Sequence, residues 1–238
     1  MPSCRRGGPE LVGRDSIARS ASKGLGPVHG YHGQYLRVDL STGTASTIAI
    51  PASVLRRVIG GVGLGAWLLH RECPVDADPL APEAPLIFAF SPLVGTPLTT
   101  SAKFAVVAKS PLTGMITDAL SSSHFAIAGK KLGFDALVFV GACATPSIWV
   151  DGALERTDLW GRSAAEAEGA LADRGRVAAI GIAGENGVRY ATISNEGRHA
   201  GRGGLGAVMG SKRLKAIVVR GSTPTSLHDS RRVVELAG

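Results

Sequence analysis

The most informative segment of this chain is Arg198-His-Ala-Gly-Arg-Gly-Gly-Leu-Gly-Ala-Val-Met-Gly-Ser-Lys-Arg-Leu-Lys215. It combines five glycines with three arginines and two lysines, and it contains no acidic residue. Glycine lets a backbone approach a ligand closely and adopt positive φ. Free backbone N–H groups and arginine side chains are typical ligands of phosphate. Together with the apolar run 216–219, the segment predicts an anion-binding loop, a short helix and a buried strand.

The positive charge of the chain is concentrated around this segment. The 238 residues carry a net charge of +7, and residues 198–220 contribute six cations and no acid, a local net charge of +6. Such an excess predicts a polyanionic ligand or partner. A nucleic-acid surface is one alternative. It is disfavoured because no recognition helix, zinc finger or RNA-binding motif accompanies the charge, and aromatic residues make up only 5% of the chain.

The three cysteines, Cys4, Cys73 and Cys143, are odd in number and far apart. This argues against a disulfide framework and favours a reducing cytoplasm. Since the chain has no Cys-x-x-Cys pair, it does not supply the usual four-thiolate iron–sulfur site by itself. No apolar run reaches the roughly 18 residues of a membrane helix. The sequence therefore predicts a cytoplasmic protein without a membrane partner.

The hydrophobic pattern predicts an α+β fold with mixed or antiparallel sheets, because strands are short and do not alternate regularly with helices. The glycines of 60–65 are expected to interrupt one helix, Ser121–Ser123 to form a turn, and residues 181–187 to form a loop. Strands are predicted at 36–40, 46–50, 86–90, 104–108, 136–140, 147–150, 177–180, 188–193 and 216–219, and helices at 51–59, 66–70, 124–132, 163–173 and 227–237.

Several motifs suggest chemistry that their context does not support. Gly61-x-Gly63-x-x-Ala66 and Gly201-x-Gly203-x-x-Gly206 match a dinucleotide-binding fingerprint, which needs a preceding strand and a following helix. The first motif follows a helix, so its favoured role is close helix packing. The second motif begins several residues after the preceding strand ends, so a phosphate ligand other than a dinucleotide is favoured. Asp118 and Asp135 are interpreted as turn and helix-end residues, so no catalytic or metal-ligating side chain is assigned.

Several long blocks of this chain, among them 35–43, 104–114 and 200–212, resemble in order and spacing the N-terminal domain of the tungsten-containing aldehyde ferredoxin oxidoreductase family. The blocks include Tyr35-Leu-Arg-Val-Asp-Leu-Ser-Thr-Gly43, Phe104-Ala-Val-Val-Ala-Lys-Ser-Pro-Leu-Thr-Gly114 and Ala200-Gly-Arg-Gly-Gly-Leu-Gly-Ala-Val-Met-Gly-Ser-Lys212. The resemblance covers roughly residues 33–222. It implies two β-sheets with short helices that hold a tungsten (or molybdenum) bis-pterin, whose phosphates are joined by a magnesium ion.

The resemblance also implies which residues hold this cofactor. Arg198, Gly201 and Arg202 are predicted to bind the pterin phosphates, and His199 occupies the magnesium-facing position, where the family uses a backbone oxygen. Three positions depart from the family pattern. Lys103 stands where the family has an arginine and so loses the planar fork. Leu120 and Ser122 stand in the family's Asn-Ser-Gly-Gly segment, where glycine permits a closer approach.

The predicted organisation is a disordered basic tail at 1–30, a cofactor-binding domain at 31–224, and the start of a missing C-terminal region at 225–238. Full-length family members oxidise aldehydes to carboxylic acids and pass electrons through a [4Fe–4S] cluster to ferredoxin. The cluster and substrate pocket belong to the later region, so this chain is expected to be catalytically incomplete without a C-terminal domain or subunit. A homo-oligomer, a non-catalytic phosphate-binding module and a reductase of another substrate with the same cofactor remain alternatives.

Overall fold

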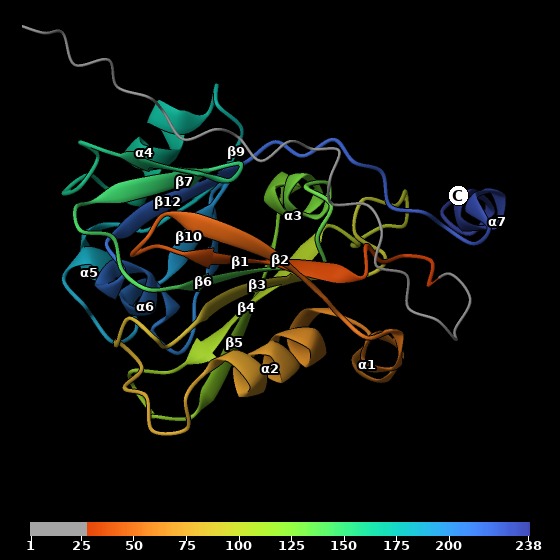
Figure 1. Ribbon diagram of the computed structural model, residues 1–238. Helices are drawn as coiled ribbons and strands as arrows, with labels where there is room; N and C mark the ends of the chain where they lie inside the picture. Colours follow the sequence, from red (N-terminus) through yellow and green to blue (C-terminus); the bar gives the residue numbers. More distant parts are fainter. Residues whose placement is uncertain (1–27) are drawn as a thin grey trace, which may run out of the picture.

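The computed structural model describes residues 28–238, so the predicted tail lies almost wholly outside the described residues. These residues form two six-stranded mixed sheets and seven helices (Figure 1). The predicted fold class, α+β with two antiparallel-rich sheets and short helices, is confirmed.

The first sheet has the strand order β2-β1-β6-β3-β4-β5. All neighbouring strands are antiparallel except β1 and β6, which are parallel. Three helices belong to this half of the chain, and α1 and α2 cover one face of the sheet (Figure 1). The elements are β1 Gln34–Asp39, β2 Thr44–Ala49, α1 Ala52–Val58, α2 Gly61–Glu72, β3 Leu86–Phe90, β4 Lys103–Lys109, β5 Ile116–Ser122, α3 His124–Lys130 and β6 Ala136–Val140.

The second sheet repeats the topology of the first. Its order is β11-β10-β9-β12-β7-β8, and its single parallel pair is β7 with β12. Numbered within its own sheet, each half has the order 2-1-6-3-4-5, with a short helix between the fifth and sixth strands. The elements are β7 Ser147–Val150, β8 Ala153–Arg156, α4 Ala164–Leu171, β9 Arg176–Ala179, α5 Ile182–Glu185, β10 Ile193–Asn195, β11 Arg198–Ala200, α6 Leu205–Ser211 and β12 Leu214–Val219.

The core is explained by the alternation of side chains along the strands. In β3, Phe88 and Phe90 point into the cluster shared by the two sheets, whereas Ile87 and Ala89 pack against α1 and α2. Since both faces are covered, the strand is apolar at every position, as a short buried run predicts. The shared cluster holds a set of touching aromatic rings from both halves of the chain, namely Phe88, Phe104, Phe125, Phe139 and Trp149.

Four local predictions were wrong. The glycines of 60–65 lie mostly inside the single helix α2, where Gly65 lets α2 approach Val107 of β4. Ser121 and Ser122 belong to β5 rather than to a turn, and only Ser123 caps the next helix. Residues 188–192 precede the short β10, and residues 182–185 form α5. In each case tertiary packing overrides the local signal.

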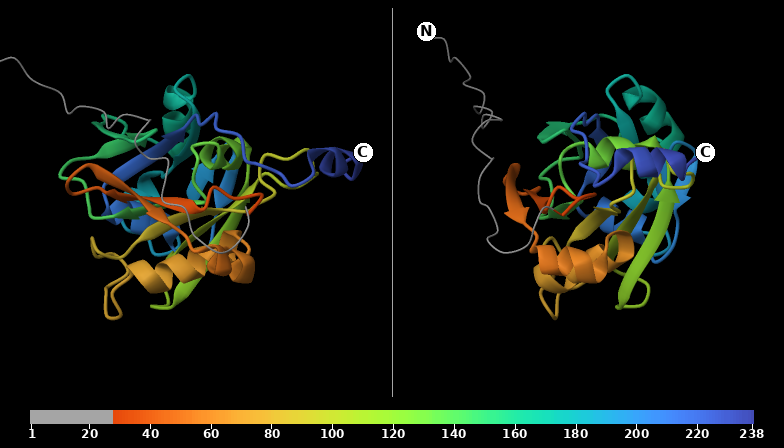
Figure 2. Two further views of the ribbon diagram at one scale, coloured as in Figure 1. Left: turned by 45° about the vertical axis from the view of Figure 1, so that its right-hand side comes forward. Right: turned by 90° about the vertical axis from the view of Figure 1, so that its right-hand side faces the viewer.

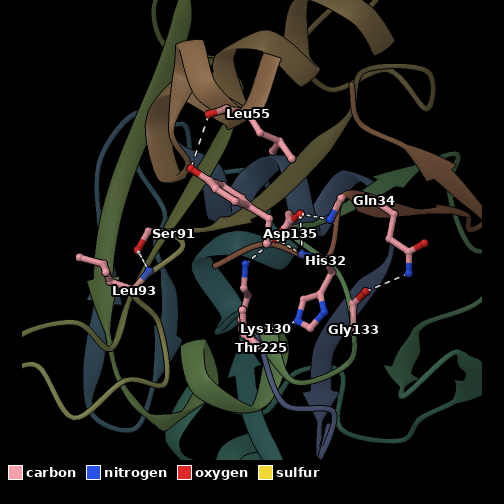
Figure 3. A network of polar contacts seen from close by, with 11 residues as sticks. His32, Gln34, Leu55, Ser91, Leu93, Lys130, Gly133, Asp135 and Thr225 are labelled. Atoms are coloured by element: carbon pink, nitrogen blue, oxygen red, sulfur yellow. Dashed lines mark hydrogen bonds and ion pairs between the residues drawn. The ribbon is translucent and has the colours of Figure 1, made fainter. Parts of the chain in front are cut away.

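Asp135 is the centre of a buried polar network rather than a helix-end residue (Figure 3). Its carboxylate pairs with the buried ammonium of Lys130 and accepts the backbone N–H groups of His32 and Gly33 at 3.1 and 2.7 Å. Burial lowers the pKa of Lys130, and the negative charge of Asp135 opposes this shift. Asp118 lies in β5. The predicted turn and helix-end roles of the two aspartates were therefore wrong.

The C-terminal helix α7, Ser230–Glu235, projects from the body of the molecule and buries none of its residues (Figure 2). Residues before it are held against the body, because the N–H of Gly30 donates to the carbonyl of Ser226 at 2.7 Å and that of Thr223 to Lys131 at 2.8 Å. Within the described residues, no helix has both the length and the apolar character needed to cross a membrane.

Candidate functional site

A hollow of about 470 Å³ lies at the seam between the two sheets. The edge strand of each sheet meets the other there, because β5 ends one sheet, β11 ends the other, and the two strands are in contact. A second hollow of about 460 Å³ adjoins the first and shares Thr100, Lys103 and Leu120 with it. The lining of the first hollow consists of Thr100, Lys103, Leu120, Ser121, Ser122, Arg198 and His199.

The structure brings five of the seven predicted site residues around this hollow. Lys103 is the first residue of β4, Leu120 and Ser122 lie on β5, and Arg198 and His199 lie on β11. Strand β11 was expected to be part of a loop, and it instead pairs with β10 in a hairpin. Gly201 and Arg202 follow β11 directly and are exposed, but they are not part of the lining.

Three exposed cations lie on β4, on β11 and directly after β11. Among the described residues, Lys103, Arg198 and Arg202 form no ion pair, and all three are exposed. Charged groups that face an open hollow without a counter-ion favour an anionic ligand. The site therefore suits a phosphate or a similar group.

The remaining cations of the segment 198–220 are mostly committed to the fold. Lys212 and Lys215 are fully buried, and Arg220 pairs with Asp151 at 2.7 Å. Lys215 donates to the carbonyl of Arg162 at 2.7 Å and pairs with Glu185. Two of the six cations are therefore buried, whereas Arg198, Arg202, Arg213 and Arg220 remain exposed. The surface charge of the segment is smaller than its sequence suggests, which weakens the case for a nucleic-acid-binding module.

Four of the five glycines between 198 and 215 are required by packing. A Cβ atom on Gly203 would overlap Thr117, and one on Gly204 would overlap the carbonyl of Arg189, while both residues have left-handed φ angles of 71° and 78°. Gly206 and Gly210 face other backbone segments in the same way. Gly201 differs, because its φ is not left-handed and its nearest neighbour would be the Thr192 Cγ2 at 3.7 Å. The chain itself does not require glycine at 201, which leaves room for a ligand.

Sequence reasoning missed the residues that support the hollow. Thr100 lines both hollows and has a φ of 61°, which is strained for a β-branched residue and typical of functional sites. His199 Nδ1 lies 3.0 Å from Thr192 Oγ1. Ser121 and Asn195 join the two sheets beneath the site. No sequence pattern identifies these residues, since their partners lie far away in the chain.

Lys212 predicts a measurable pH dependence of stability. It donates to the carbonyls of Pro82 and Gly141 at 3.0 and 3.2 Å, and burial lowers its pKa to about 8 from 10.5. Between these two pH values the unfolded chain binds more protons than the folded one, so this residue's contribution to stability rises with pH. The unfolding free energy of the wild type, relative to Lys212→Met, should rise by roughly 3 kcal/mol across this range. Urea unfolding at both pH values measures the difference, and a constant difference would contradict the burial of the ammonium group.

The comparisons with known proteins agree with this architecture. The sequence model described as the N-terminal domain of aldehyde ferredoxin oxidoreductase matches residues 35–221. The chain belongs to this family. A tungsten-containing aldehyde ferredoxin oxidoreductase from Pyrococcus furiosus is 41% identical over 216 residues, which cover 86% of this chain and 36% of the relative. The corresponding protein of Thermococcus kodakarensis has the same identity and the same coverage.

Relatives with other names share the domain. The WOR-like subunit of an aliphatic sulfonate oxidoreductase from P. furiosus is 30% identical over 223 residues, covering 83% of this chain and 35% of the relative. Among solved structures, the active site complex BamBC of benzoyl coenzyme A reductase with 1,5 dienoyl-CoA matches with a TM-score of 0.77 and 35% identity, covering 83% of this chain and 32% of that one. The chain therefore spans about a third of the length of these relatives, all of which are oxidoreductases by name.

Proposed function

We propose that this domain binds a tungsten–pterin cofactor at the seam hollow and holds it mainly by its phosphate groups. The observation that carries the proposal is the pair of exposed cations, Lys103 and Arg198, which face the hollow and form no ion pair among the described residues. Gly201, which follows two residues after the lining residue His199, has no packing reason to be glycine. The residues present fit a phosphate-bearing group, because arginine and lysine bind phosphate through charge-assisted hydrogen bonds.

The repeated topology supports a ligand with two similar halves. The hollow lies between equivalent strands of the two sheets, and each strand leads into an equivalent short helix, α3 or α6. Arg198, Gly201 and Arg202 would hold the phosphates, and His199 would offer its backbone oxygen to a bridging magnesium ion. The tungsten–pterin group, when bound, supplies the redox chemistry, while this chain's own residues bind and orient it.

We assign the remaining functions to a complete enzyme. The proposed reaction is the oxidation of an aldehyde to a carboxylic acid, with electrons passing through a [4Fe–4S] cluster to ferredoxin. Two thirds of the length of the relatives has no counterpart in these 238 residues, and we place the cluster ligands and the substrate pocket in that part. The cytoplasm is the proposed location.

A second candidate reaction keeps the cofactor and changes the substrate. It is favoured by the similarity to the benzoyl coenzyme A reductase complex, which is 35% identical to this chain and matches its fold with a TM-score of 0.77. The sulfonate oxidoreductase subunit points in the same direction. The two candidates share the binding role of this domain and differ only in the part that forms the pocket.

Gly201→Ala tests the proposed binding role. Because a Cβ at this position makes only ordinary contacts within the chain, folding should be unaffected or gain slightly, with the midpoint of urea unfolding unchanged or higher. Cofactor loading should fall, since the added methyl group enters the space left for the ligand. The measurement is the tungsten and pterin content of purified protein, expressed with tungstate in a host that makes molybdopterin.

Arg198→Ala provides an independent variant and Gly169→Ala the matched control. The arginine variant should weaken cofactor retention by roughly 1.5–3 kcal/mol through the loss of one charge-assisted contact. Gly169 lies exposed on α4, where a Cβ meets open space, so its replacement should leave loading unchanged. Normal cofactor content in both site variants would show that the seam hollow is not the binding site.

A further inference from the structure

A buried polar bridge crosses the seam beneath the hollow. The Ser121 hydroxyl of β5 donates to Oδ1 of Asn195 at 3.1 Å and accepts from its Nδ2 at 2.9 Å. Asn195 belongs to β10 and is fully buried, and its Nδ2 also lies 3.4 Å from the carbonyl oxygen of Arg198. The side-chain amide of Asn195 therefore connects β5 to the backbone of Arg198.

A second bridge holds the other end of β5. Ser110 is fully buried after β4, and its Oγ donates to the carbonyl oxygen of Gly203 at 2.8 Å. The Ser110 Oγ also accepts the N–H groups of Leu112 and Thr113 at 3.1 and 3.3 Å. Its hydrogen-bonding capacity is thus used completely. The glycine turn after β11 is fixed to the β4–β5 hairpin by this one hydroxyl.

Each of the two bridges connects the opposite walls of one site. Lys103, Leu120 and Ser122 belong to the first sheet, whereas Arg198 and His199 belong to the second. An anion that contacts both walls needs them at a fixed separation. Side chains that bind a ligand lose affinity for it when the contacts that hold them in place allow them to move. Each bridge joins a residue of the first sheet to the hairpin or turn that carries the cations of the second.

We infer that Ser121, Asn195 and Ser110 are positioning residues, which clamp the two sheets at the spacing that the anion site requires. This inference rests on the proposed binding of phosphate at the seam. Ser121 lines the hollow and bonds to the buried Asn195, which contacts the backbone of Arg198, whereas Ser110 holds the turn 201–204 at the other end of β5. Their removal should widen the range of separations between the two walls while leaving the cations themselves in place.

The experiment uses the full 238-residue chain and inorganic pyrophosphate as the probe, with isothermal titration calorimetry at low salt. Ser121→Ala and Ser110→Ala should each raise the Kd for pyrophosphate roughly three- to tenfold. Ser147→Ala is the matched control, since it removes a buried hydroxyl of β7 that donates to Thr145 at 2.9 Å, away from the seam. It should lower the melting temperature without changing the Kd. Ser121→Thr keeps the hydroxyl and should restore binding.

Hydrogen exchange separates positioning from general loss of stability. Each variant is measured at the same number of degrees below its own melting temperature. Backbone amides at 196–204 should then exchange faster in the Ser121 and Ser110 alanine variants than in the Ser147 variant. If the wild type does not bind pyrophosphate, the proposed anion site is wrong. If the wild type binds and both seam variants keep its Kd, the anion site stands and the clamp is wrong. Ser110→Ala tests the clamp even if Ser121→Ala yields no folded protein.

Discussion

Gly210→Ala is expected to lower the free energy of unfolding by about 3 kcal/mol or more. A Cβ on Gly210 in α6 would overlap the carbonyl oxygen of Gly184 in α5 and lie 2.6 Å from its carbonyl carbon. Both atoms belong to the backbone, so no side-chain rotation relieves the overlap. The two helices would have to separate, and α6 is buried along almost its whole length. Urea unfolding followed by circular dichroism measures the loss.

The same substitution at Gly169 provides the comparison. This glycine lies in the exposed part of α4, with a helical backbone and open space around its missing side chain. Alanine should stabilise the helix there by about 0.5–1 kcal/mol. A loss of stability at position 210 together with a gain at position 169 would demonstrate that close contact with Gly184, rather than helix propensity, requires glycine at position 210. An unchanged urea midpoint for Gly210→Ala would show that α5 and α6 do not cross as closely as the structure has them.

The glycine-rich segment shows how far sequence alone extends. Its helix and its buried strand are confirmed, because helix length and apolar runs are local signals. Its glycines were attributed to anion binding, yet four of them serve contacts with backbone and side chains distant in sequence, such as Thr117 and Gly184. A sequence records that a glycine is present but not which neighbour requires it.

Strand β5 was missed for a related physical reason. Its sequence, Ile116-Thr-Asp-Ala-Leu-Ser-Ser122, buries only the small residues Ala119 and Ser121 and exposes Leu120. An edge strand that packs through small side chains lacks the alternation of large apolar and polar residues that identifies a half-buried strand. No strand was therefore predicted there and Ser121–Ser123 were assigned to a turn, although β5 forms one wall of the hollow.

The glycines and cations of 198–215 indicated one side of the candidate site, and the resemblance indicated the other side. Lys103 and Arg198 are separated by more than 90 positions in the chain and become neighbours of one hollow only when two sheets meet edge to edge. The supporting residues Ser121 and Asn195 have no distinctive pattern, because a buried hydrogen bond between sheets leaves no periodic signal. Sequence reasoning therefore predicted five residues that lie around the hollow and missed Ser121 and Asn195, which join the two sheets there.

Asp135→Asn should lower the free energy of unfolding by about 3–5 kcal/mol, because it leaves the buried ammonium of Lys130 without a counter-charge. The amide oxygen, at the Oδ2 position, can still accept the N–H groups of His32 and Gly33, whereas the amide nitrogen at the Oδ1 position cannot accept from Lys130 (Figure 3). The change therefore removes both the charge and the hydrogen-bond acceptor of Lys130. Thermal and urea unfolding at pH 7 provide the measurement. The neutral pair Lys130→Met with Asp135→Asn should regain a large part of the loss, since no buried charge remains.

The pH dependence of the single variant distinguishes charge from shape. In the wild type Asp135 raises the pKa of Lys130 against the lowering caused by burial, so its removal lowers that pKa further. Between the new folded pKa and the higher folded pKa of the wild type, folded Asp135→Asn has lost the Lys130 proton that the unfolded chain and the folded wild type still hold. The stability of Asp135→Asn relative to the wild type should therefore rise with pH in this window. The double variant has no such group at 130 and should show no comparable rise. If the double variant is as unstable as the single one, the loss comes from the backbone contacts of residues 32 and 33 and not from the unpaired cation.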